Sequence, residues 1–155
     1  MEFREAFWAE ETKGISFILS DEEIPTWWLQ SPDSSKLLTG WLTGAPLKKF
    51  QRLDHQQQIT LCLQSLASIF GRPLAFLKDQ LAAAYIADWP AAPYIQGGYS
   101  FETVDSSGAR QLLFQPVQQT IFFAGEALYE GPSPGTVEAA FTSGQEVAKK
   151  IIAQS

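Results

Sequence analysis

Residues 120–152 read TIFFAGEALYEGPSPGTVEAAFTSGQEVAKKII, and the rest of the chain is organised around this stretch. A strand-forming apolar run at residues 121–123 leads to Gly125, and a loop rich in glycine and proline follows. A helix is predicted from near Gly135, because apolar residues recur on one helical face: Val137, Ala140, Phe141, Gly144, Val147, Ala148, Ile151 and Ile152. The pattern predicts a strand, a glycine turn and a helix whose N-terminus can meet an anion or a carbonyl oxygen.

The composition indicates one compact unit over residues 1–155. A net charge of −6 argues against nucleic acid as a partner. The single cysteine, Cys62, excludes an internal disulfide, and the single histidine, His55, gives no basis for a metal site. No apolar run reaches the roughly 20 residues that cross a membrane, and the N-terminus has no signal-peptide pattern. We therefore expect a cytoplasmic protein with no membrane or nucleic-acid partner.

Upstream, three short apolar runs separated by turns predict an antiparallel meander over residues 15–20, 27–30 and 36–43. Asp54 and Gln57 have capping-box spacing and open a predicted helix over residues 54–70. Residues 81–89 are ambiguous, because their alanines favour a helix whereas their alternation fits a strand.

FFAGE and GTVEAAFTSG lie in the C-terminal stretch, and PYIQGGYSF at residues 93–101 precedes them. Together and in this order, these motifs resemble the FAD-dependent amine oxidases, the monoamine and polyamine oxidase family. GWLTGAP at residues 40–46 fits more loosely. The resemblance covers nearly the whole chain, but only about the last third of a full-length family member.

The resemblance implies an α+β fold and a strand at residues 81–89. In that fold a mostly antiparallel substrate-domain sheet with packed helices is followed by the last strand and helix of an FAD-binding domain. Residues 1–110 would form the substrate-domain part, and residues 111–155 the strand, loop and helix of the FAD-binding domain.

Two segments of the C-terminal stretch would contact the cofactor. Gly125 and Glu126 close the final strand, where glycine lets the backbone approach the cofactor. Gly135, Thr136 and Val137 open the helix, whose N–H groups would face the flavin ring. The residues alone also fit an exposed turn with a solvated acid and an ordinary helix start, and the spacing suits a phosphate equally well.

The segment Gly97-Gly98-Tyr99-Ser100 matches the part of the family that passes close to the flavin. In monoamine oxidases the position of Tyr99 is a cysteine bonded to the flavin, so the resemblance implies non-covalent FAD here. Ser100 and Thr136 stand where those enzymes place two tyrosines beside the amine. Trp89, Tyr94 and Tyr99, with Ser100, would line a different substrate pocket, or the aromatic residues are simply core or rim residues.

The chain lacks a G-x-G-x-x-G fingerprint, and the family lysine would fall just before Met1. We therefore expect the C-terminal part of a flavin-dependent amine oxidase, without catalytic residues of its own and not catalytic in isolation. Its expected partners are a small-molecule amine, an N-terminal half or a second copy of the chain. The alternative is a non-catalytic binding or interaction module that kept the fold.

Overall fold

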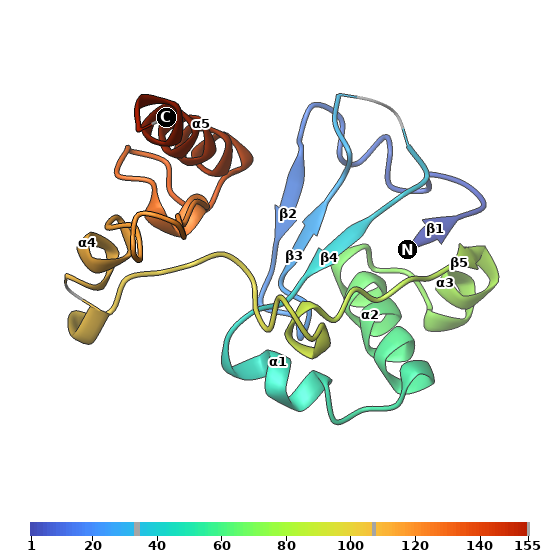
Figure 1. The fold of residues 1–155 in the computed structure, drawn as a ribbon. Helices are drawn as coiled ribbons and strands as arrows, with labels where there is room; N and C mark the ends of the chain where they lie inside the picture. Colours follow the sequence, from blue (N-terminus) through green and yellow to red (C-terminus); the bar gives the residue numbers. More distant parts are fainter. Residues whose placement is uncertain (33–34, 107, 155) are drawn as a thin grey trace. The chain divides into compact units, whose positions relative to one another are not determined.

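The computed structural model describes residues 1–32, 35–106 and 108–154 (Figure 1). The chain divides into two compact units, Met1–Ile86 and Ala87–Ser155, rather than the single unit expected from its length. The division lies at residue 86, whereas the partition at residue 110 follows the domains of the resembled family and stays a prediction.

A three-stranded antiparallel sheet forms the first unit's centre (Figure 1). β2 (Phe17–Leu19), β3 (Thr26–Trp28) and β4 (Thr39–Trp41) lie in the order β2-β3-β4, which confirms the predicted meander. Trp27 pairs with Ile18 on one side and with Gly40 on the other, and its side chain is fully buried.

A second, two-stranded sheet corrects the prediction for residues 81–89. Only β5 (Leu81–Ala83) is extended and paired, and it pairs antiparallel with β1 (Glu2–Phe3) rather than joining the meander. A strand needs a neighbouring strand for its backbone groups, and residues 84–87 pair with no strand in the described part of the chain. The helix favoured by the alanines does not form either, because Leu81 is already extended at ψ 119°.

Three helices complete the first unit: α1 (Ala45–Phe50), α2 (His55–Ile69) and α3 (Leu74–Gln80). The predicted capping box opens α2, since Asp54 Oδ1 accepts from the Gln57 N–H at 2.8 Å and Gln57 Oε1 accepts from the Asp54 N–H at 2.9 Å. Among the described residues no single helix is long and apolar enough to cross a membrane; α2 and α3 reach that length only together, across a bend of 117°.

The hydrophobic core lies in the first unit, between the sheet and α2 and α3. Its fully buried side chains come from both layers: Phe3, Trp27, Leu38, Leu63, Leu66 and Leu77. Edge-to-face contacts around Phe7 extend it toward Phe70 and Phe76, with ring centroids 5.5 and 5.4 Å away. This core gives the first unit a well-packed interior of its own.

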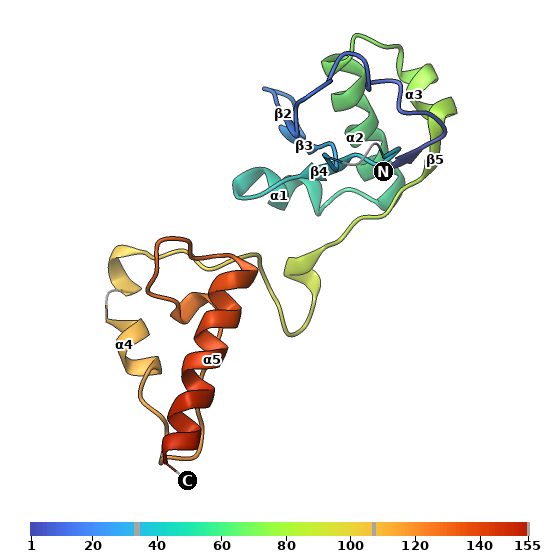
Figure 2. The ribbon, with the colours of Figure 1, turned by 90° about the horizontal axis from the view of Figure 1, so that it is seen from above.

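The second unit contains short helical segments and one long helix (Figure 2). η1 (Trp89–Ala91), η2 (Val104–Ser106), α4 (Ala109–Leu113) and η3 (Glu126–Leu128) precede α5 (Val137–Ala153). The predicted strand at residues 121–123 is wrong, because an isolated bridge between Val117 and Ile121 is all that forms there. A buried parallel strand requires sheet neighbours, and the described residues provide none.

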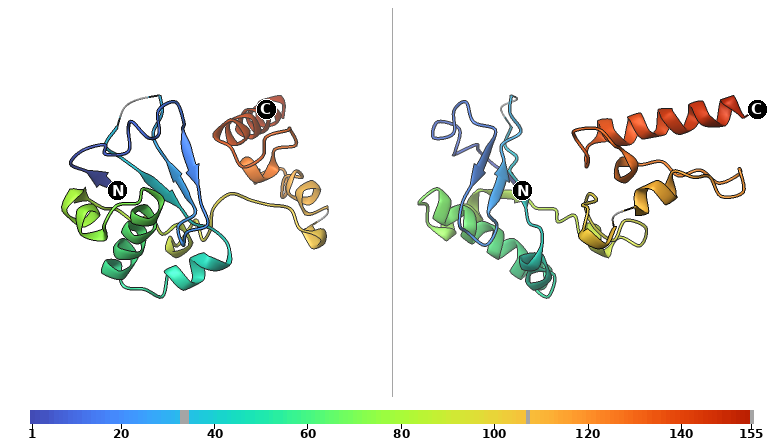
Figure 3. Two further views of the ribbon diagram at one scale, coloured as in Figure 1. Left: turned by 180° about the vertical axis from the view of Figure 1, so that it is seen from behind. Right: turned by 90° about the vertical axis from the view of Figure 1, so that its left-hand side faces the viewer.

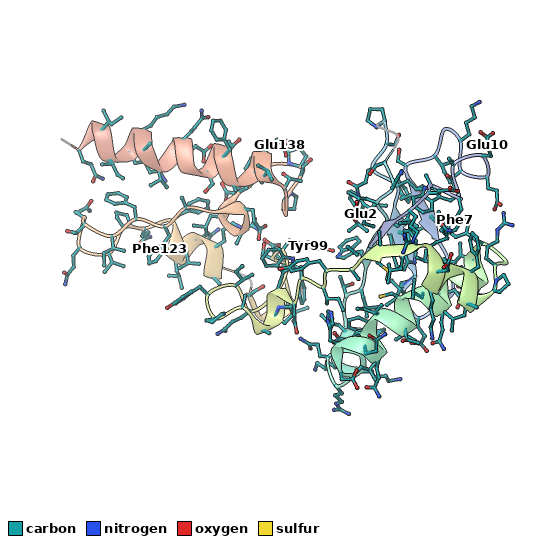
Figure 4. All side chains as sticks on the ribbon, turned by 90° about the vertical axis from the view of Figure 1, so that its right-hand side faces the viewer. Glu2, Phe7, Glu10, Tyr99, Phe123 and Glu138 are labelled. Atoms are coloured by element: carbon teal, nitrogen blue, oxygen red, sulfur yellow. The ribbon has the colours of Figure 1, made fainter. Side chains whose placement is uncertain are left out.

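The segment around Phe123 runs alongside α5 instead (Figures 3 and 4). The helix α5 begins where the sequence predicts, but its predicted apolar face is buried only in part, with Ala140, Gly144 and Val147 half-buried. Ala139 and Ser143 are buried, whereas Val137, Phe141 and Ile152 are 80%, 66% and 74% exposed. The helix α5 therefore carries an exposed apolar stripe of Val137, Phe141 and Ile152.

Candidate functional site

The carboxylate of Glu126 joins three segments of the second unit. Its Oε1 accepts from the Ser100 N–H at 2.8 Å, and its Oε2 accepts from the Ser100 hydroxyl at 2.9 Å. The same Oε2 accepts from the Gly135 N–H at 3.0 Å. The glycine-rich turn at residues 97–100, the Gly125–Glu126 turn and the start of α5 therefore meet at one side chain.

Opposing influences set the pKa of Glu126. Partial burial raises it, but hydrogen bonds from Ser100 and Gly135 and the positive charge of Arg110 bring the pKa below its ordinary value. Arg110, in α4, donates from Nε to the Ala127 carbonyl at 3.1 Å and pairs with Glu102. The carboxylate is therefore held in its charged form, which accepts hydrogen bonds from all three donors.

Gly125 leaves the backbone accessible next to this network. Its φ of 156° and ψ of 172° lie in a region that is essentially restricted to glycine. Its N–H donates to the Ser143 hydroxyl of α5 at 3.2 Å, and no heavy atom lies within 4 Å of the place a Cβ would occupy. A ligand could approach the chain closely here.

The start of α5 is built by Gly135 and Thr136. Gly135 has a φ of 75°, and a Cβ there would lie 3.3 Å from the Tyr99 Cβ, so the two turns are in contact. The Thr136 hydroxyl caps the helix by accepting from the Ala139 N–H at 3.1 Å. The N–H groups of Val137 and Glu138 precede the first intrahelical bond and have no acceptor in the described part of the chain.

The predicted substrate residues are only partly gathered. Tyr99 and Ser100 lie at the Glu126 network, and Figure 4 labels Tyr99. Tyr94 is 100% exposed, and Trp89 lies in η1 and is 55% exposed. Neither side chain is joined to the network by a hydrogen bond among the described residues. No group of three or more possible metal ligands occurs in the described ranges either.

Two residues of the candidate site were not predicted from the sequence. Ser143, which is 2% exposed, ties Gly125 to α5. It was recognisable as a polar residue on the small-residue side of that helix. Arg110 donates a hydrogen bond to the carbonyl of Ala127, which lies 17 residues further along the chain, and no local sequence pattern predicts this contact.

Comparison with known proteins gives a consistent result. The family model described as flavin containing amine oxidoreductase matches residues 1–152. Lysine-specific histone demethylase 1B of Mus musculus is 26% identical over 99% of this chain and 19% of its own length. Peroxisomal N(1)-acetyl-spermine/spermidine oxidase of Homo sapiens is 28% identical over 98% of this chain and 34% of its own length.

Among solved structures, wild-type putrescine oxidase bound to putrescine superimposes with a TM-score of 0.78 at 21% identity. That likeness shows the fold, and it covers 97% of this chain and 33% of putrescine oxidase. The chain therefore spans about a third or less of the length of these relatives.

Proposed function

The chain belongs to the flavin-containing amine oxidoreductase family, and from this we propose that it forms the C-terminal part of a flavin-dependent amine oxidase. One observation supports the proposal above the others. The glycine turn at residues 97–100, Gly125 and the start of α5 converge on Glu126, and these are the three segments that the family resemblance assigns to the flavin and amine.

The residues present fit a flavin. Gly125 offers open backbone, which suits the ribityl chain. The unpaired N–H groups of Val137 and Glu138 begin a helix of 17 residues, so they favour negative charge on the flavin pyrimidine ring by about 0.3–1 kcal/mol. The Gly135 N–H already donates a hydrogen bond to Glu126. The backbone groups proposed to contact the flavin ring are therefore those of Thr136, Val137 and Glu138. Tyr99 cannot form the thioether of monoamine oxidases, so FAD would be held without a covalent bond.

FAD supplies the redox chemistry of such an enzyme by accepting a hydride equivalent from the amine carbon. This chain's residues would line the amine side of the site. Tyr99 packs on Gly135, and Ser100 is fixed by Glu126, so both have defined positions. Trp89 and Tyr94 are exposed aromatic side chains that would border the amine in the complete fold.

The chain in isolation binds FAD weakly and oxidises no amine. Each remaining backbone hydrogen bond contributes about 0.5–1.5 kcal/mol. Two or three of them do not offset an association cost of roughly 4–15 kcal/mol. The family's nucleotide fingerprint, which holds the pyrophosphate, is absent from this sequence.

Calorimetry tests the proposal. The 155-residue chain is titrated with FAD alone and after mixing with the N-terminal two-thirds of a related polyamine oxidase. We expect no submicromolar binding in the first case and flavin binding with its yellow absorbance in the second. Failure of the mixture to bind more FAD than the N-terminal part alone would contradict the proposal.

The exposed apolar stripe of α5 favours a second candidate function. Val137, Phe141 and Ile152 present large apolar side chains to solvent, which is typical of a surface that another chain covers. A non-catalytic interaction module would use this stripe without any flavin. Light scattering at micromolar concentration distinguishes the two candidate functions. A stable homo-oligomer that binds no more FAD when the N-terminal part is added would favour the interaction module.

A further inference from the structure

Glu126 connects backbone segments that no regular structure would otherwise hold together. Ser100 lies 26 residues before it and Gly135 lies 9 residues after it, and both sit in irregular chain. Turns of this kind have many accessible conformations, so their relative position needs a specific contact. In the described part of the second unit, the carboxylate of Glu126 makes the hydrogen bonds that span both turns.

We propose that Glu126 is a positioning residue whose carboxylate holds the Tyr99–Ser100 turn against the turn that opens α5. The two turns then move as one body. The inference rests on the proposed function in one respect: those are the turns assigned to the amine and to the flavin ring. This clamp, the Glu126 carboxylate with its bonds to Ser100 and Gly135, would fix the distance between the two ligand-facing segments before either ligand binds.

The contact requires a carboxylate rather than an amide. Three donors converge on two oxygens, namely the Ser100 N–H and hydroxyl and the Gly135 N–H. An ionised carboxylate is an acceptor on both oxygens, whereas glutamine presents one oxygen and an NH₂ group. In Glu126→Gln the NH₂ would face at least one of these donors, so at least one bond is lost and a donor–donor contact replaces it.

The charges around the clamp set how it responds to pH. Arg110 of α4 favours the ionised form and is itself paired with Glu102, while α5 adds Glu138 in its first turn. Since the pKa of Glu126 is lowered on folding, its contribution is fully present above the ordinary carboxyl range. It is lost as pH falls through the lowered pKa.

The test uses the full ¹⁵N-labelled chain without flavin. In the wild type, the amide signals of Ser100 and Gly135 should shift together with one midpoint below that of an ordinary glutamate. In Glu126→Gln both should stop titrating, and at least one of the two amides should exchange with solvent roughly three- to tenfold faster, as loss of a hydrogen bond implies. Glu146→Gln is the matched control, because Glu146 is an exposed residue of α5 whose side chain makes no hydrogen bond among the described residues.

A second variant keeps the inference testable if Glu126→Gln fails to fold. Ser100→Ala removes the hydroxyl donor only, so the Gly135 signal should keep its titration while the backbone amide at the substituted position exchanges faster. The inference is overturned if Ser100 and Gly135 do not titrate together in the wild type, or if Glu126→Gln and Glu146→Gln exchange alike. Because no flavin is present, these outcomes are independent of the calorimetry that tests the proposed function.

Discussion

Replacing Gly135 by alanine tests the geometry at the start of α5. Gly135 has a φ of 75°, which costs a residue with a Cβ roughly 1–2 kcal/mol. The new Cβ would lie 3.3 Å from the Tyr99 Cβ and 3.4 Å from its Cγ and Cδ2, so the tyrosine must shift by a few tenths of an ångström. The strain and the shift add, so we expect the local stability of this turn to fall by at least about 1–2 kcal/mol.

Hydrogen exchange read by mass spectrometry measures this local effect. A loss of about 1–2 kcal/mol accelerates exchange by roughly 5- to 30-fold, if exchange follows local opening. Peptides covering residues 97–101 and 132–140 should both respond, because Tyr99 and Gly135 are in contact. Peptides from α2 in the first unit should be unchanged.

Gly98→Ala is the matched control. Gly98 lies in the turn beside Tyr99, its φ is outside the left-handed region, and nothing lies within 4 Å of its added Cβ. Its exchange should stay within a factor of about two of the wild type, as expected for an unstrained surface substitution. Equal exchange in Gly98→Ala and Gly135→Ala would refute the reasoning, as would a response confined to residues distant from both turns.

Three further substitutions or modifications test other parts of the chain. Leu66→Ala should lower the free energy of unfolding by about 2–5 kcal/mol in urea denaturation, because Leu66 is 0% exposed; Leu112→Ala, at 75% exposure, should change it little. Gly144→Ala should stabilise α5 by about 0.5–1 kcal/mol, seen as slower exchange along the helix, since its Cβ meets nothing within 4 Å. Burial raises the pKa of Cys62 to about 11, so at pH 8 its alkylation should be roughly 100-fold slower than that of a free thiol, and denaturant should abolish the difference.

Local sequence signals predicted the first unit well. The Asp54–Gln57 capping box needs only residues three apart, and it opens α2 as expected. The meander was predictable because short turns leave antiparallel pairing as the nearest solution for the three apolar runs. The strand predicted at residues 81–89 does not continue through residues 84–89, because strand formation depends on a pairing partner that local alternation does not reveal.

The second unit shows the limit of periodicity more clearly. The start of α5 was predictable from its spacing, but spacing does not say which face finds neighbours. Its fully buried residues are Ala139 and Ser143, whereas Phe141 is exposed, and η3 is the neighbouring element that α5 contacts. Residues 121–123 have strand-forming side chains, yet no sheet neighbour is present in the described chain to pair with them.

The candidate site was predictable in its residues but not in its connections. The sequence singled out Glu126 as a cofactor contact, which stays a prediction, and in the structure its carboxylate accepts hydrogen bonds from Ser100 and Gly135. This changes what the residue can contribute: a carboxylate that accepts three protein hydrogen bonds has little capacity left for a ligand. Next to it, the first N–H groups of α5 have no acceptor among the described residues, whereas the Gly125 N–H and carbonyl already bond to the Ser143 hydroxyl and the Leu128 N–H. We therefore propose that an incoming flavin would be recognised mainly by the N–H groups that open α5, with Glu126 fixing where that backbone lies.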